Sequence, residues 1–161
     1  MAGYNVNICI PKTVIRLLVG RIAARKLVPG TSDFLRDILD TPISPELLPA
    51  AERGDIGHKT EDILGPYELH DFFLYYLVRY KMRPAKLYYY ACVAFSGEYA
   101  PAFILEKLKL FIRRFVLNQY KRSCAPDAAR LTEVCLNSGV YRFPSDLSSD
   151  FLLSELQSIT F

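Results

Sequence analysis

The sequence predicts a mainly α-helical chain with one long loop and an irregular C-terminal tail. Apolar residues recur at helical spacing in several segments, most clearly in residues 11–28, 67–82 and 101–122. Four prolines and three glycines gather within residues 40–66 among acidic residues. This composition favours a long mobile loop, and the residues 124–144 lack a clear period and are expected to form the irregular tail.

The first helix is expected to run from Pro11 to about Val28. Proline suits the first helical turn because its missing N–H is not needed there, and Pro29-Gly30 then stops the helix. Ser32 is expected to cap a short second helix. The apolar side chains of that helix fall on one face: Phe34, Leu35, Ile38 and Leu39.

Three helices are expected to follow the loop. The first runs from residue 67 to 82 and is apolar on most sides, which is typical of a central helix. The second opens at Pro84 and ends near Ser96-Gly97. The third starts at Pro101 and is expected to continue as one amphipathic helix to about Arg122.

The tail is expected to contain a hairpin and a last helix. Residues 137–139 read Asn-Ser-Gly, which favours a turn. Ser145 is expected to cap the last helix. The apolar set of that helix is Phe151, Leu152, Leu156 and Ile159.

The formal charge of +3 hides an uneven distribution of charged residues. Residues 1–30 carry five bases and no acid, residues 31–71 carry ten acids and three bases, and residues 72–122 carry ten bases and two acids. The simpler interpretation is charge complementarity within the chain. The alternative is a basic site for an anionic ligand such as a nucleotide phosphate.

Cysteine usage and hydropathy favour a cytoplasmic protein. None of the four cysteines forms a C-x-x-C pair, and Cys92 lies in an apolar run that suggests a buried, reduced thiol. No cleavable signal is recognised at the N-terminus, and the apolar runs FFLYYLV and LYYYACVAF are too short to span a bilayer. We therefore expect no membrane association and a location in the cytoplasm.

Few residues suggest chemistry by themselves. His58 and His70 have no other metal ligand nearby in sequence, so a zinc site is not expected, and His70 suits a structural role in its helix. Glu61 and Asp62 either hold Mg²⁺ against phosphates or place acidic charge at a helix N-terminus. Lys121 either binds a phosphate or carboxylate or complements the C-terminus of its helix.

Five segments, in order, carry a resemblance to a known family. They are YNVN-x-x-IPKT (4–13), ILDTPISPELLP (38–49), LGPYELHDFFLYYLVRY (64–80), QYKRSCAPD (119–127) and RFPSD (142–146). Together they resemble the synthetase part of the glutamine-dependent NAD synthetases. By this resemblance, residues 1–161 are identified as the C-terminal part of that synthetase domain.

The resemblance implies a fold and a reaction. The family's synthetase domain is an α/β fold of the ATP-pyrophosphatase type, similar to the adenine-nucleotide α-hydrolases. It adenylates deamido-NAD with ATP and Mg²⁺, and ammonia released from glutamine by a separate glutaminase domain then displaces AMP. The expected partners are these substrates, the rest of the synthetase, the glutaminase domain and further copies in a homo-oligomer.

The resemblance also implies roles for particular residues. Tyr4, Asn5, Val6 and Asn7 match a stretch that helps to bind deamido-NAD, and Lys121 matches a lysine that contacts the same substrate. The two asparagines offer amide donors and acceptors that suit a ring or a ribose.

A second set of matching residues lies in the long loop. Thr41 and Ser44 match the start of a loop that closes over the nucleotides, and Glu61 and Asp62 match its acidic, magnesium-contacting end. Two departures from the family stand out. The S-G-G-x-D-S phosphate loop is absent, so the chain alone is expected not to catalyse, and residues 128–130 read Ala-Ala-Arg where the family reads G-P-K.

Two other functions compete with this interpretation. An assembly module is suggested by the surplus of aromatic residues in segment 67–95, which would present apolar surfaces to a partner. Nucleic-acid binding is suggested by the basic residues of segment 107–122, but the pI of about 8.6 and the acidic loop argue against it. We expect no nucleic-acid partner.

Overall fold

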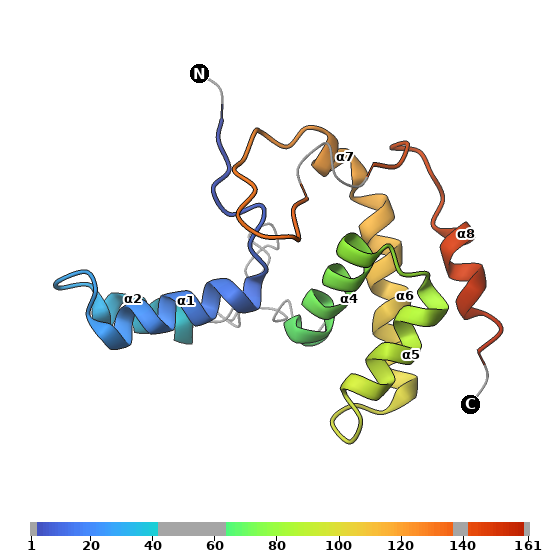
Figure 1. Ribbon diagram of the computed structural model, residues 1–161, viewed down its shortest axis with the longest axis horizontal. Helices are drawn as coiled ribbons and strands as arrows, with labels where there is room; N and C mark the ends of the chain where they lie inside the picture. The colour runs from blue at the N-terminus through green and yellow to red at the C-terminus, as the bar shows by residue number, and fades with distance from the viewer. Residues whose placement is uncertain (1–2, 42–63, 137–141, 160–161) are drawn as a thin grey trace, which may run out of the picture. The chain divides into compact units, whose positions relative to one another are not determined.

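The computed structural model describes residues 3–41, 64–136 and 142–159 (Figure 1). Helices make up all the regular structure of these residues, which contain a single isolated bridge and no strand. The prediction of a mainly helical chain is therefore confirmed, whereas the α/β parent fold stays a prediction. Most of the expected loop 40–66 and the expected turn at 137–139 lie outside the described residues.

The chain divides into two compact units, residues 12–67 and residues 1–11 with 68–161. In the first unit, α1 (Lys12–Arg25) and α2 (Ser32–Asp40) form a helical hairpin. The prediction that Ser32 caps α2 is wrong, because Ser32 is already the first helical residue. Thr31 occupies the capping position, and its hydroxyl donates to the Val28 carbonyl instead (2.9 Å).

The second unit contains α4 (Tyr67–Tyr80), α5 (Pro84–Ala94) and α6 (Pro101–Leu117), with Tyr67 at the boundary between units. The helices α5 and α6 begin at prolines, as predicted, since a first-turn residue needs no N–H donor. After α5 the chain turns at Gly97, whose φ of +84° is a conformation that favours glycine.

One hydrophobic core joins α4, α5, α6 and the last helical segment. Phe73 of α4 packs against Phe111 of α6, with ring centroids 5.5 Å apart, and Phe72 meets Phe95 after α5 at 5.3 Å. The sequence predicted that α4 is the central helix, but α6 supplies the largest share of buried side chains. The outer face of α4 carries tyrosines such as Tyr80, which is exposed.

The C-terminal elements differ from the prediction in two places. The expected single helix 101–122 is interrupted at Asn118, after which α7 (Gln119–Ser123) begins. The last helix, α8 (Asp150–Leu153), passes into a 3-10 turn (Ser154–Leu156).

The prediction that Ser145 caps this last helix is wrong. Ser148, two residues before α8, accepts the Asp150 N–H through its hydroxyl (3.2 Å). None of the helices that the structure describes has both the length and the apolar character needed to span a bilayer.

Candidate functional site

The N-terminal segment lies along the segment that follows α7 (Figure 1). Tyr4 and Asp127 form a parallel bridge, and the Asn5 N–H donates to the Asp127 carbonyl (3.1 Å). Next to this bridge, a Cβ on Gly3 would lie 3.6 Å from a Pro126 side-chain carbon, an ordinary van der Waals contact. Two of the five segments of the family resemblance, 4–13 and 119–127, thus meet in space.

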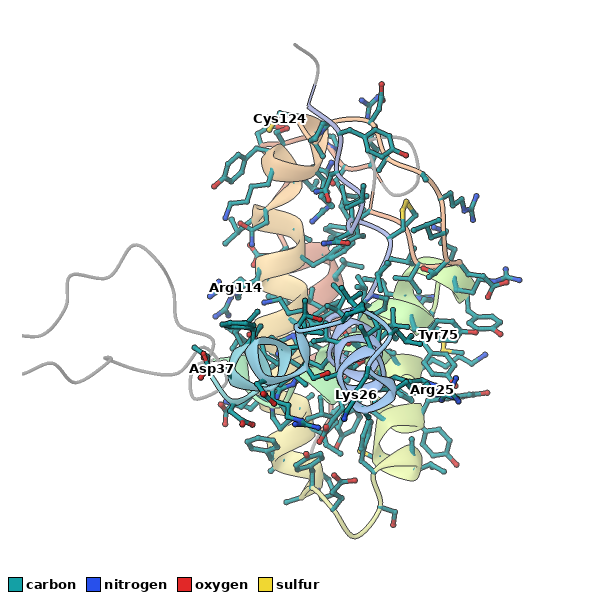
Figure 2. The ribbon with its side chains drawn as sticks, turned by 90° about the vertical axis from the view of Figure 1, so that its left-hand side faces the viewer. Arg25, Lys26, Asp37, Tyr75, Arg114 and Cys124 are labelled. Atoms are coloured by element: carbon teal, nitrogen blue, oxygen red, sulfur yellow. A yellow bond between two sulfur atoms is a disulfide. The ribbon has the colours of Figure 1, made fainter. Side chains whose placement is uncertain are left out.

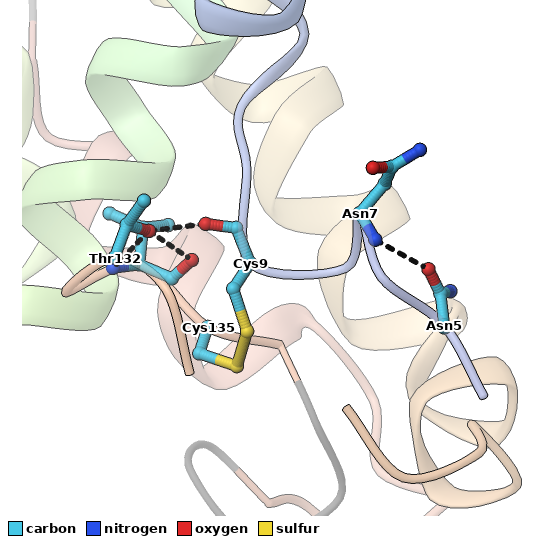
Figure 3. Close-up of a disulfide and its surroundings, with 6 residues drawn as sticks. Asn5, Asn7, Cys9, Thr132 and Cys135 are labelled. Carbon is cyan, nitrogen blue, oxygen red and sulfur yellow. Dashed lines mark hydrogen bonds between the residues drawn. A yellow bond between two sulfur atoms is a disulfide. The ribbon is translucent and has the colours of Figure 1, made fainter. Parts of the chain in front are cut away.

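A disulfide joins Cys9 of the N-terminal segment to Cys135, which lies further along the segment that follows α7 (Figure 3). Both cysteines are fully buried. The Thr132 hydroxyl donates to the Cys9 carbonyl and accepts the Val134 N–H (3.2 Å), so a side-chain hydrogen bond supports the covalent link.

The pairing was not apparent in the sequence, because 126 positions separate the two cysteines and no short motif marks them. Cys92 has a free thiol, as predicted, but it is half-buried rather than buried. The cytoplasmic location stays a prediction.

The residues expected to bind deamido-NAD in the N-terminal segment are largely accessible. Tyr4 is 59% exposed and Val6 57%, Asn7 is exposed, and Asn5 is half-buried. The Asn7 N–H donates to the Asn5 side-chain oxygen (3.1 Å), which fixes a local turn (Figure 3). Because the side-chain amide of Asn7 has no hydrogen-bond partner in the described part of the chain, it can accept or donate to a ligand.

Lys121 is exposed on α7, with its ammonium 5.9 Å from the centroid of the Tyr120 ring. It lies six positions before Asp127, the residue that pairs with the N-terminal segment. The structure gives no contact between Lys121 and residues 4–7 within the described ranges. Their convergence on one ligand therefore stays a prediction.

A buried glutamine anchors α7, and the sequence interpretation missed it. Gln119 is fully buried, and its side-chain oxygen accepts from the Arg122 guanidinium (2.7 Å) and from the Phe143 N–H (3.3 Å). Its side-chain amide donates to the Ser123 hydroxyl (3.1 Å). The signal that could have revealed it is its spacing, four residues after Phe115 on the buried face of α6.

Arg122 is held partly inside the protein beside this glutamine. Its guanidinium carbon lies 4.0 Å from the centroid of the Phe115 ring, a close cation–π contact. Burial lowers the pKa of Arg122 from its ordinary value, since desolvation disfavours the charged form. Of the two basic residues in the last turn of α7, Arg122 packs against Phe115 and Gln119, whereas Lys121 is exposed and can contact a ligand.

Of the residues predicted in the nucleotide loop and at its magnesium-contacting end, Thr41 is the one that the structure describes. Thr41 lies in the other unit and ends α2, where its N–H and hydroxyl both donate to the Asp37 carbonyl (2.9 and 2.8 Å). Ser44, Glu61 and Asp62 lie outside the described residues. Within residues 3–41, 64–136 and 142–159 no group of three His, Cys, Asp or Glu side chains could hold a metal ion, so the Mg²⁺ site stays a prediction.

Comparison with known proteins gives matches over almost the entire chain. It is 32% identical, over 177 aligned positions, to a glutamine-dependent NAD(+) synthetase of Mycobacterium leprae, and the alignment covers 98% of this chain. The chain is homologous to glutamine-dependent NAD(+) synthetases. A synthetase of Mycobacterium tuberculosis is also 32% identical over 176 positions, which cover 97% of this chain.

The family resemblance predicted from the sequence is thereby confirmed. The chain spans about a quarter of the length of these synthetases, since 26% of each relative is matched. No protein-family model matches the chain.

Proposed function

We propose that this chain forms part of a glutamine-dependent NAD synthetase and contributes binding groups for deamido-NAD. In the complete reaction, ATP and Mg²⁺ would activate the nicotinate carboxylate as an adenylate, and ammonia from glutamine would displace AMP. The observation that carries the proposal is the pairing of the N-terminal segment with the segment after α7 through Tyr4, Asn5 and Asp127.

The chemistry of the exposed groups suits a nucleotide substrate. The amides of Asn5 and Asn7 can donate to and accept from hydroxyl and carbonyl groups, and the Tyr4 ring offers an aromatic surface. The Lys121 ammonium is a compact cation that suits a phosphate or carboxylate. These groups bind and orient, and none of them activates a carboxylate, so the described residues of this chain are expected to need the rest of the synthetase for catalysis.

Isothermal titration calorimetry with deamido-NAD tests the proposal directly. We expect saturable binding to the purified chain, weakened roughly 10- to 150-fold by Lys121→Ala, because a hydrogen bond to a charged group contributes about 1.5–3 kcal/mol. Lys86→Ala is a matched control, since Lys86 is also exposed and its ammonium also lies near a tyrosine ring, 5.4 Å from that of Tyr90. Absence of binding, or an equal loss in both variants, would contradict the proposal.

A second titration with NAD identifies the group that Lys121 contacts. Deamido-NAD and NAD share the pyrophosphate and differ only in the carboxylate or amide of the nicotinoyl ring. If Lys121 pairs with the carboxylate, Lys121→Ala should weaken the binding of deamido-NAD far more than the binding of NAD. If Lys121 pairs with a phosphate, the substitution should weaken the binding of both ligands to the same extent.

A further inference from the structure

The disulfide between Cys9 and Cys135 is the point at which the N-terminal segment is buried in the protein. Among residues 3–10, Cys9 alone is buried, whereas Tyr4 and Asn7 are exposed. Residues 3–10 contain no helix or strand, and they meet the chain after α7 through an isolated bridge at Tyr4. Because few of their side chains are packed, the covalent link determines much of their position.

A turn connects the disulfide to the candidate binding residues. The Ile10 N–H donates to the Asn7 carbonyl (3.0 Å), and the Asn7 N–H donates to the Asn5 side-chain oxygen (3.1 Å). Cys9 lies between Asn7 and Ile10 and is therefore part of one run of local hydrogen bonds that begins at Asn5. A shift of Cys9 would move the two asparagines with it.

The cysteine on the other side of the disulfide is fixed to the helices of its unit. Val134 and Cys135 are buried, and Leu136 packs against the hydrophobic core. Glu133 also pairs with Arg79 of α4 (2.9 Å). These contacts do not involve the N-terminal segment, so this stretch is a fixed support to which the segment is attached.

We propose that Cys9 and Cys135 are positioning residues for the candidate deamido-NAD site, and that the site binds its ligand tightly only while they are joined. This inference rests on the proposed function, because it concerns the same binding residues. Reduction would leave the segment held by the bridge at Tyr4 and by the hydrogen bond from Thr132 to the Cys9 carbonyl. The affinity for the nucleotide would thus follow the thiol redox state of the surroundings.

The reductant is a dithiol, and the exchange has two steps. One thiolate of the dithiol attacks a sulfur of the disulfide, so the S–S bond breaks, a mixed disulfide forms and the other cysteine leaves as a thiolate. The second thiolate of the dithiol then attacks its own sulfur in the mixed disulfide and releases the remaining cysteine. The two cysteine thiolates take up the two protons that the dithiol gave up. Two electrons and two protons thereby pass from the dithiol, which becomes a disulfide, to the protein.

The burial of both sulfurs couples this exchange to ligand binding. An attacking thiolate reaches them only when the N-terminal segment moves away from the chain after α7. A ligand that holds the segment in place opposes this movement. By linkage, the factor by which the disulfide strengthens ligand binding equals the factor by which the ligand shifts the disulfide towards its oxidised form.

Isothermal titration calorimetry of the chain in two redox states tests the proposal. We expect the oxidised chain to bind deamido-NAD at least about tenfold more tightly than the chain reduced with dithiothreitol, because the free segment must be ordered before it binds. Oxidation with glutathione disulfide should restore the affinity. Saturable binding of equal affinity in the two states, or tighter binding by the reduced chain, would overturn the proposal and leave the proposed function standing.

Two cysteine variants identify the responsible thiols. Cys9→Ala should bind weakly in both states, whereas Cys124→Ser should respond to reduction as the unchanged chain does. Cys124 is the matched control, since its thiol is free and exposed just past the end of α7 (Figure 2) and three positions from Lys121. A redox response that persists in Cys9→Ala, or that is lost in Cys124→Ser, would assign the effect to another thiol and refute the proposal.

Hydrogen exchange separates this inference from the proposed function, because it needs no ligand. Reduction should speed the exchange of backbone amides in residues 4–10 by at least about tenfold and leave α4, α5 and α6 unchanged. Equal exchange in the two states would overturn the positioning role. Absence of deamido-NAD binding in both states would instead contradict the proposed function, and hydrogen exchange would then test the positioning role by itself.

Discussion

Replacing Gln119 by alanine should destabilise the second unit, because one buried side chain there makes three hydrogen bonds. The variant leaves the Phe143 N–H and one nitrogen of the Arg122 guanidinium without their acceptor. A buried donor that loses its partner costs about 1–3 kcal/mol. Arg122 is only partly buried and can recover some hydration, so we expect a total loss of about 2–4 kcal/mol.

Urea unfolding followed by far-ultraviolet circular dichroism measures this loss as a lower midpoint at an unchanged slope. Ser123→Ala is the matched control, since it removes one hydrogen bond of the same glutamine from an exposed hydroxyl that water can replace, at about 1 kcal/mol or less. A loss below about 1 kcal/mol in Gln119→Ala, or an equal loss in both variants, would refute the view that Gln119 anchors α7.

Two further predictions concern the region around α5. Gly97→Ala should cost about 1 kcal/mol of unfolding free energy, because φ is +84° and an added Cβ meets no atom within 4 Å, so the cost is purely conformational. Gly97→Asn should cost less in the same urea assay, and equal costs would contradict this. Burial raises the pKa of Tyr88 to about 12 from 10.0, so the folded state retains a proton that the unfolded state releases. Stability contributed by Tyr88 is therefore present below pH 10.0 and lost as pH rises towards about 12. Tyr88→Phe should flatten this decline when unfolding is measured as a function of pH. A profile identical to that of the unchanged protein would disprove the effect.

Helix starts were predictable from sequence where one residue type decides them. Pro84 and Pro101 open α5 and α6 because proline fits the first turn and no other local signal competes. Serine caps were not predictable, because several neighbouring hydroxyls can fill the same position. Ser32 is the first residue of α2 rather than its cap, and the hydroxyl of Ser148, not that of Ser145, accepts the first N–H of α8.

The break between α6 and α7 was not predictable because Gln119, the residue that anchors α7, also continues the apparent helical pattern of α6. Gln119 continues the buried face of α6 beyond Phe115, so the sequence pattern passes through Asn118 without interruption. Whether a polar side chain at such a position is buried depends on distant partners. Here the deciding partner is the Phe143 N–H, 24 positions away.

The candidate site was predictable only in part. The family resemblance selected segments 4–13 and 119–127, and the structure places the backbone of Tyr4 and Asn5 against Asp127. Local sequence patterns do not predict which residues join the two segments. The bridge and the cysteine pair both connect residues more than 120 positions apart, a range over which helical periods and short motifs carry no information.

The bond between Cys9 and Cys135 closes the polypeptide into a ring that includes α1, α2 and α4 to α7. Only the first residues and the tail with α8 lie outside it. A protease that cuts once inside the ring would open it without separating the pieces, which would stay attached until a reductant is added. The candidate ligand-binding residues would thus remain tethered to α7 even in a nicked chain, whereas a cut in the tail would leave α8 held only by its noncovalent packing in the hydrophobic core.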